Sequence, residues 1–569
     1  MSSPHLDPAQ RRASVEARYP EWTPQAIHAW FLRTAEAFPD RDFVVTDERT
    51  FSYREIAERV RRVAGGLHAR GVRKGDHVAV MMANYPEYVV LKYALSTLGA
   101  VIVPLNFAFK RDELAFVLRN SEAVALITMT GFRGLDYLAM LDEIVPGWER
   151  GGFAELPDLR FVVQFEAMAP LRPGVAAFPA LEAGGEPPDD LPEVAGDDLS
   201  ILFYTSGSTG APKGVLWTHD QDARIGYGGA VSRAFGDGWR VLSALPLYHA
   251  FANNEVLNAS MFAGGAVITR LQFAPDDILA AIERHRANEL VTVPTMVISL
   301  CDGATTTDHD MGSLVGLMSA GAPAPVWLWE RAMSLLQVTE ATTGYGQTES
   351  GGGQVMSRPE DGVEFVASTV GRIKYAGVAG IPERGGDVAE MRAADPETGE
   401  ILPDGEIGEL ISRGPVNAVG YWKRPDETTT FREGGWVYSG DIGRVTSDGA
   451  VHLTGRKKEL IRSGAENYAP KEVEDLLTSQ PGISQAYVVG IPDPKWGEIG
   501  CAWLVRDSGT DADEAALAHA LERVCREKLA AFKRPRQFRF IEAAQLPTTA
   551  TGKVQKFRLV EMAAQGPVG

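Results

Sequence analysis

Short runs of apolar, largely β-branched residues alternate with segments of helical periodicity through the first two-thirds of the chain. The first series predicts strands at 77–82, from 100 and at 123–129, with helices at about 87–98 and 111–120 between them. The pattern resumes with predicted strands at 161–165, 201–207, 266–271, 290–294 and 315–323, and a helix at 276–287. Strands that alternate with helices in this way are typical of βαβ units and parallel sheets.

The periodicity changes twice along the chain. A Pro- and Gly-rich stretch at 183–198 predicts a break between two subdomains. An irregular patch at 376–400 precedes strand patterns at 405–414 and 449–455, so we expect a β-rich subdomain at about 360–455. After Arg456 the pattern starts again as a separate α+β series, with helices at 470–478 and about 512–530 and strands at 486–491, 501–506 and 538–542.

These patterns predict an α/β protein of two domains. The first, residues 1–455, is expected to contain parallel-rich sheets with helices and a small β-barrel-like subdomain. The second, residues 456–569, is expected to be a small, mobile α+β domain. The charged boundary at 455–459 carries no apolar residue before Leu460, which suits a hinge.

The 569 residues include 56 Lys and Arg against 75 Asp and Glu, a formal charge of −19. Such a charge repels polyphosphate backbones and argues against nucleic acid as a partner. Three scattered cysteines suit neither a disulfide framework nor a C-x-x-C metal site and favour the reducing cytoplasm. The N-terminus lacks the apolar segment of a secretory signal, and the apolar stretch 88–107, which contains Lys92, reads as a buried helix and strand rather than a transmembrane segment.

A loop rich in glycine and hydroxyl groups follows the predicted strand at 201–204. It comprises Thr205, Ser206, Gly207, Ser208, Thr209, Gly210, Ala211, Pro212 and Lys213. Its backbone N–H groups, hydroxyls and one lysine suit a polyphosphate. It is not a Walker A loop, because Pro212 and Gly214 stand where that motif needs Gly and Ser or Thr. A plain surface turn is the alternative for this segment taken alone.

The sequence YTSGSTGAPKG at 204–214 closely resembles the signature of the AMP-forming adenylating superfamily, which includes acyl-CoA synthetases, peptide-synthetase adenylation domains and beetle luciferases. Further motifs follow in the same order: PLYHAFA at 246–252, SAGAP at 319–323, GYGQTE at 344–349, YSGDIG at 438–443, GRKKELIRSGAENYAP at 455–470 and LPTTATGKVQKFRL at 546–559. The resemblance therefore extends over essentially the whole chain and is strongest with acyl-CoA synthetases.

The resemblance implies a role for each motif. His249 would lie between the acyl pocket and the α-phosphate of ATP, Thr348 would contact that phosphate, and Lys553 would be the catalytic lysine. Mg²⁺ would be held by Glu349 and Thr205, and Lys458 would be the hinge residue. The remaining nucleotide contacts would come from the 205–213 loop, from the adenine-flanking residues Gly321, Ala322, Pro323, Gly344, Tyr345, Gly346 and Gln347, and from Asp441 and Arg456 at the ribose.

Taken singly, each residue has an ordinary explanation. A lone histidine such as His249 is more often structural, Asp441 beside a glycine could form an Asx turn, and Lys553 could be a solvent-facing charge. Their order and neighbours together favour an enzyme that joins a small carboxylic acid to coenzyme A, with ATP and Mg²⁺. The alternatives are transfer of the acyl group to another acceptor, such as a carrier-protein phosphopantetheine, oxidation of the adenylate as in luciferases, and a catalytically silent nucleotide-binding scaffold.

Two departures from the family pattern affect the substrates. Gly464-Ala465 replaces a glycine pair, and the added methyl could narrow a pantetheine passage. Asn253, followed by Asn254, stands where long-chain members carry a tryptophan gate, and this small, polar entrance suggests a short, medium or ring-bearing acid. The sequence does not identify the acid or the oligomeric state; a homodimer is one state it allows.

Overall fold

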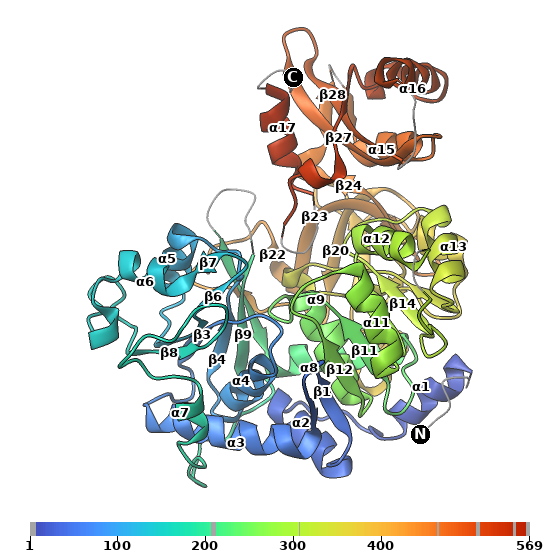
Figure 1. The fold of residues 1–569 in the computed structure, drawn as a ribbon. Helices are drawn as coiled ribbons and strands as arrows, with labels where there is room; N and C mark the ends of the chain where they lie inside the picture. The colour runs from blue at the N-terminus through green and yellow to red at the C-terminus, as the bar shows by residue number, and fades with distance from the viewer. Residues whose placement is uncertain are drawn as a thin grey trace. The chain divides into compact units, whose positions relative to one another are not determined.

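The computed structural model describes residues 7–205, 212–305, 308–463, 466–507, 513–549 and 554–564. Its chain divides into two compact units, coloured along the sequence in Figure 1. The first unit comprises Met1–Glu390 and Ser412–Val437, and the second comprises Met391–Ile411 and Tyr438–Gly569. The domain boundary predicted after residue 455 stays a prediction.

Two large sheets form the framework of the first unit (Figure 1). The strands of one sheet run in the order β15 (Glu340–Thr342), β14 (Gly316–Ser319), β13 (Glu289–Thr292), β11 (Arg240–Ser243), β12 (Ala266–Thr269), β1 (Asp42–Val45) and β2 (Thr50–Ser52). All its pairs are parallel except β1 with β2. The carboxyl ends of β11, β13, β14 and β15 therefore meet at one edge of this sheet.

The second sheet has the order β21 (Gly420–Tyr421), β10 (Lys213–Thr218), β9 (Leu199–Thr205), β4 (Val101–Pro104), β3 (His77–Met81), β5 (Ala125–Met129) and β8 (Phe161–Phe165). Its pairs from β9 to β8 are parallel, whereas β9 with β10 and β10 with β21 are antiparallel. Strand β21 comes from the far end of this unit's sequence, so the edge of the sheet joins segments about two hundred residues apart.

Helices cover these sheets. Strand residues of the first sheet share a core with α11 (Pro275–His285), α12 (Pro294–Ala304) and α13 (Val326–Leu335), which cover one of its faces. Helix α8 (His219–Ser232) packs against β9 and β10 of the second sheet and against α2 (Ile27–Ala37). Helix α4 (Pro86–Thr97) is buried along nearly all its length. In the part of the chain that the structure describes, no helix is long and apolar enough to cross a membrane.

The second unit contains the α+β series predicted after Arg456. Its sheet has the order β26 (Glu466–Tyr468), β25 (Ile461–Ser463), β28 (Gly497–Arg506) and β27 (Ile483–Asp493), with β29 (Gln537–Phe540) parallel to β28. Alternate residues of β27 and β28 enter two different cores. Ala502 and Leu504 join the core of α15 (Pro470–Thr478) and α16 (Glu514–Lys528), whereas Cys501 and Trp503 join that of α17 (Lys556–Ala564). Two-sided burial explains the long apolar run in β28.

Strands β19 (Glu390–Ala394), β20 (Gly408–Arg413), β23 (Trp436–Val445) and β24 (Val451–Arg456) form a further sheet. The prediction that 376–400 is irregular is wrong in part, because β19 lies inside it. Its segment MRAA has three of four residues buried by packing that adjacent sequence does not reveal. The α/β fold class is confirmed, and the helices predicted at 111–120 and 470–478 have the predicted bounds.

Each of the three cysteines lies in a different hydrophobic core. Cys301 packs among α11–α13, Cys525 lies in the core under α15 and α16, and Cys501 lies in the core under α17. Burial raises the pKa of each thiol to about 11. Protonated, buried thiols are poor nucleophiles and poor metal ligands, so the cysteines have a packing role.

Candidate functional site

Three predicted motifs follow the carboxyl ends of parallel strands in the first sheet. His249 follows β11, residues 319–323 overlap and follow β14, and residues 344–349 follow β15. Strands β14 and β15 are direct neighbours, with Met318 opposite Thr342. Ligands of parallel α/β sheets commonly bind at this edge, and the register brings together the two motifs that were predicted to flank the adenine.

The residues of SAGAP and GYGQTE have backbone conformations that depend on glycine. Gly321 has φ +87°, and the next residues, Ala322 and Pro323, are exposed. Gly344 and Tyr345 form β16, paired with β17 (Val355–Met356). At Gly346 a Cβ atom would lie 2.6 Å from the backbone nitrogen of Gly353, so a side chain is excluded there.

Glu349 lies in the short 3₁₀ helix Thr348–Ser350, capped by Gln347. Three hydrogen bonds from distant segments hold this turn. The indole Nε1 of Trp217 donates to the Thr348 carbonyl at 2.8 Å, and the backbone N–H of Ala418 donates to the Glu349 carbonyl at 3.0 Å. The hydroxyl of Tyr421 donates to Glu349 Oε1 at 2.8 Å. The turn is thus fixed at both its backbone and its side chain.

Thr205 and Lys213 face each other in the β9–β10 register, at the two ends of the glycine-rich loop. Thr205 Oγ1 donates to the Lys213 carbonyl at 3.5 Å. Lys213 Nζ lies 2.9 Å from Glu427 Oε2 and 4.7 Å from the centroid of the Tyr421 ring. Hydrogen bonds from Thr429 and from Lys213 lower the pKa of Glu427 to about 2. The Lys213 ammonium group therefore lies beside Tyr421, the residue that donates a hydrogen bond to Glu349.

His249 caps the N-terminus of the short helix Ala250–Ala252, where its Nδ1 accepts a hydrogen bond from the Phe251 N–H at 3.3 Å. The helix continues as a π-helical segment, Asn253–Asn258. Such segments inside α-helices are often found at functional sites. His249 is exposed.

Asn253 and Asn254, which were expected at a small, polar entrance, lie inside the protein. Both are buried, at 1% and 0% exposure. Asn253 accepts from Lys92 Nζ and donates to Asp222 at 2.6 Å, while Asn254 donates to the Gly351 carbonyl at 3.0 Å. These contacts tie the π-helical segment to α4, α8 and the loop after Glu349.

Asp441 and Arg456 are directly opposite each other in the β23–β24 register of the second unit. Arg456 Nε lies 2.9 Å from Asp441 Oδ1. The aspartate side chain is only 2% exposed, and the arginine side chain is 45% exposed. Arg456 therefore fixes the carboxylate of Asp441, the candidate for the ribose. Lys458 is exposed in the next turn, the 3₁₀ helix Lys457–Glu459.

Several predicted residues lie outside the described part of the chain. They are Ser206, Gly207, Ser208, Thr209 and Gly210 of the loop, the catalytic candidate Lys553, and the Gly464-Ala465 pair. Their roles stay predictions.

The described residues fit a magnesium ion that is held largely by its nucleotide. Within the described ranges, no group of three or more His, Cys, Asp or Glu side chains could enclose a metal. Mg²⁺ commonly binds through one or two carboxylates together with substrate phosphates. Glu349 supplies one carboxylate, and the Tyr421 hydroxyl donates a hydrogen bond to it.

Sequence reasoning missed Trp217, Tyr421 and Glu427. The pair Gly420-Tyr421 is visible in the sequence, but nothing there links it to Glu349, because the link depends on the long-range pairing of β10 with β21.

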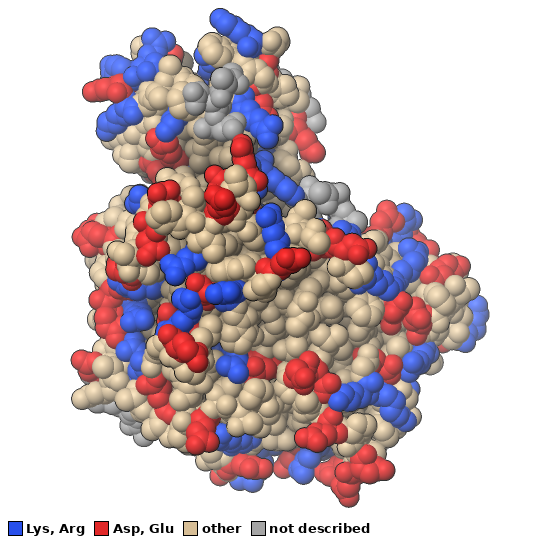
Figure 2. Space-filling view, turned by 180° about the vertical axis from the view of Figure 1, so that it is seen from behind, with Lys and Arg blue, Asp and Glu red and all other residues tan. Residues whose placement is uncertain are grey.

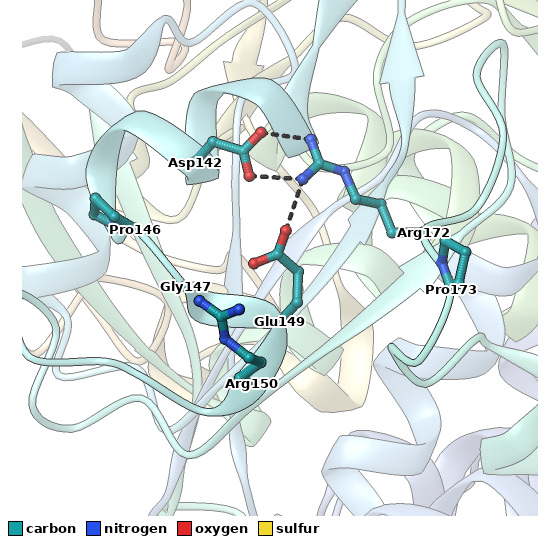
Figure 3. Close-up of a pocket in the computed structure, with 7 residues that line it drawn as sticks. All are labelled: Asp142, Pro146, Gly147, Glu149, Arg150, Arg172 and Pro173. Atoms are coloured by element: carbon teal, nitrogen blue, oxygen red, sulfur yellow. Dashed lines mark hydrogen bonds and ion pairs between the residues drawn. The ribbon is translucent and has the colours of Figure 1, made fainter.

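A pocket of about 580 Å³ lies elsewhere in the first unit and contains none of the predicted site residues. Figure 3 shows the carboxylates of Asp142 and Glu149 pointing toward the Arg172 guanidinium at its wall. Two carboxylates on one guanidinium leave no surplus positive charge at Arg172 for an anion. On the face seen in Figure 2, acidic and basic side chains are interspersed rather than gathered into a basic stripe.

The chain is similar to known protein families and to named relatives. Residues 31–422 match the AMP-binding enzyme family, and residues 472–553 match the AMP-binding enzyme C-terminal domain. A feruloyl-CoA synthase from Amycolatopsis sp is 35% identical over 540 residues, which cover 94% of this chain and 98% of the relative. A CoA ligase from Mycobacterium tuberculosis, named for a bicyclic octahydro-indenyl propanoyl group, is 34% identical over 95% of this chain and 99% of its own.

Solved structures agree with these matches. A crystal structure of an anthranilate CoA ligase with anthranoyl-AMP has a TM-score of 0.81 at 25% identity, and covers 96% of this chain and 99% of its own. ATP-bound MatB from Rhodopseudomonas palustris has a TM-score of 0.80 at 28% identity, with 95% and 99% coverage. The resemblance drawn from the motifs is confirmed: the chain belongs to the AMP-binding enzyme family and carries the family's C-terminal domain.

Proposed function

We propose that the protein is an ATP-dependent carboxylic acid–CoA ligase. The observation that carries the proposal is the match over more than nine-tenths of the chain to proteins named as CoA ligases. The carboxylate attacks the α-phosphorus of ATP and displaces pyrophosphate, giving an acyl-adenylate. The thiolate of coenzyme A then attacks the acyl carbon and releases AMP.

The first half-reaction brings several negative charges together, so it needs positive charge and hydrogen-bond donors in place beforehand. In the proposal, Lys213 and the glycine-rich loop bind the pyrophosphate, and Lys553 binds the attacking carboxylate. Glu349 and Thr205 hold Mg²⁺, which supplies Lewis-acid stabilisation of the phosphates when bound. Asp441 and Arg456 bind the ribose, and Thr348 and His249 face the α-phosphate.

The second half-reaction requires the thiol to reach the anhydride. We propose that the C-terminal domain, with Lys553, rotates away about Lys458 between the two steps. The position of Lys458 in a short exposed turn supports this role, because hinges need a few residues free to change backbone torsions.

We propose a ring-bearing acid as the substrate class. The support is the naming of the relatives for feruloyl, anthranilate and bicyclic propanoyl groups. A long flexible acyl chain has less support, since Asn253 occupies the position of the tryptophan gate typical of long-chain members and is itself buried in a polar network.

The test is exchange of labelled pyrophosphate into ATP by the purified chain with magnesium and a panel of aromatic, alicyclic and fatty acids. We expect exchange to depend on the acid and to be fastest with ring-bearing acids. Addition of coenzyme A should then consume free thiol in step with AMP release. Acid-dependent exchange without thiol loss would instead support another acyl acceptor, and no exchange with any acid would overturn the proposal.

A further inference from the structure

Tyr421 connects two parts of the proposed nucleotide site. Its hydroxyl donates to Glu349 Oε1 at 2.8 Å, and its ring lies 4.7 Å from Lys213 Nζ. Phe431 packs edge-on against the same ring, with centroids 5.0 Å apart. One buried side chain therefore contacts both the carboxylate proposed to hold Mg²⁺ and the lysine proposed to bind the leaving pyrophosphate.

The backbone fixes the place of Tyr421. In the β10–β21 pair, Tyr421 is opposite Val215 and Gly420 is opposite Leu216. The next residue continues the contact, because the Trp422 N–H donates to the Gly214 carbonyl at 2.8 Å. Strand β10 begins at Lys213, at the end of the glycine-rich loop, and Tyr421 pairs with Val215, two residues further along that strand. This pairing holds the Tyr421 ring near Lys213.

The chemistry of the phenol suits a positioning role. The Tyr421 hydroxyl is an uncharged hydrogen-bond donor, and it donates to Glu349 Oε1. A lysine or arginine in the same place would neutralise Glu349 and compete with a metal ion. A neutral donor fixes the orientation of the carboxylate and leaves its negative charge available.

Lys213 is held from two sides. The Tyr421 ring presents its electron-rich face to the ammonium group, and Glu427 Oε2 lies 2.9 Å from Nζ. A change in the position of the ring would therefore affect Lys213 as well as Glu349.

We propose that Tyr421 is a positioning residue for the magnesium–nucleotide complex, orienting Glu349 through its hydroxyl while its ring keeps Lys213 beside the phosphates. The inference rests on the proposed function, because Mg²⁺ and ATP are the ligands that Glu349 and Lys213 would bind. The positioning role of Tyr421 can be tested separately from the ligase activity, because it concerns nucleotide binding and requires no acyl substrate.

The experiment measures equilibrium binding of ATP by calorimetry, in magnesium and in EDTA, for the wild-type chain and Tyr421→Phe. The substitution removes the hydroxyl and retains the ring beside Lys213. We expect affinity in magnesium to fall about tenfold, the effect of losing one hydrogen bond to a charged group, and affinity in EDTA to change little.

Tyr375→Phe is the matched control. The Tyr375 hydroxyl donates to Glu16 Oε1 at 2.9 Å, so this variant also loses one Tyr–Glu hydrogen bond in the same unit, away from the predicted motifs. It should bind ATP like wild type in both conditions. Urea unfolding of both variants shows whether either has a general loss of stability.

Three results would overturn the inference. They are equal loss of affinity by Tyr421→Phe in magnesium and EDTA, equal losses in the two variants, and wild-type affinity that does not depend on magnesium. Failure of the proposed function has a different signature: magnesium-dependent ATP binding that Tyr421→Phe weakens, with no acid-dependent pyrophosphate exchange by the wild-type chain.

Discussion

Lys92 and Asp222 form a buried ion pair between α4 and α8. Lys92 Nζ lies 2.9 Å from Asp222 Oδ2, with side-chain exposures of 2% and 0%. Asn253 and Asn258 complete the cluster, since each donates to Asp222 and accepts from Lys92. Burial lowers the pKa of Lys92, and the Asp222 charge acts against that shift. We predict that Lys92→Met strongly destabilises the protein, because it leaves a buried carboxylate without its cation.

The magnitude follows from the geometry. At an effective dielectric constant of about 20, unit charges 2.9 Å apart attract by about 6 kcal/mol. Desolvation of both groups offsets most of this, and removal of one partner from a buried pair typically costs about 3–5 kcal/mol. The two asparagine amides still donate to Asp222 in the variant. We therefore expect Lys92→Met to lower the free energy of unfolding by about 3 kcal/mol, at the lower end of that range.

Urea unfolding followed by tryptophan fluorescence measures the effect. The double variant Lys92→Met/Asp222→Asn removes both charges and should recover at least half of the loss. Arg111→Met is the control, because it removes an ion pair in which the side chains of Arg111 and Glu143 are 52% and 63% exposed. Solvent screens that pair, so the urea midpoint should stay nearly unchanged. A double variant no more stable than Lys92→Met would refute the reasoning.

Three other predictions concern the ribose pair, the hinge and acid stability. Asp441→Asn should raise the KM for ATP at least about tenfold, since a neutral amide is a weaker acceptor for ribose hydroxyls; an unchanged KM in steady-state kinetics would exclude the ribose role. Lys458→Pro should leave acid-dependent pyrophosphate exchange largely intact and strongly reduce thioester formation, whereas equal loss of both activities would contradict rotation about this residue. Burial lowers the pKa of His219 to about 3, below its unfolded value, so its contribution to stability is full above about pH 6.5 and is lost as the pH falls toward 3. The wild-type chain should lose unfolding free energy between about pH 7.5 and pH 5, and His219→Asn should make that loss about 2 kcal/mol smaller. If urea titrations gave the variant the same pH dependence as wild type, His219 would not be the source of this acid sensitivity.

Sequence patterns were sufficient for features that depend on local order. The βαβ rhythm predicted the parallel sheets, and the helix at 470–478 was predicted with its observed bounds because its apolar spacing and Pro470 at the first turn are local properties. The short motifs also placed the candidate nucleotide-binding residues after strands, and the structure has β11, β14 and β15 ending just before or within these motifs.

Features that depend on pairing between distant segments could not be predicted. Tyr421 reaches Glu349 only because β21 pairs with β10. The buried role of Asn253 likewise depends on Lys92 and Asp222, which lie on helices from other parts of the chain. The position of Asn253 after His249 gave no indication of its burial, and so we expected it at a small, polar entrance.

The distribution of the three cysteines offers a way to follow unfolding without engineered probe residues. Cys301, Cys525 and Cys501 report on three separate cores, and each thiol becomes reactive only when its own core opens. Short pulses of an alkylating reagent at rising urea concentrations would modify each cysteine as its core opens, and peptide masses would show which cysteine reacts first. The unsubstituted chain would thus reveal the sequence in which the two faces of the C-terminal sheet and the α11–α13 layer open.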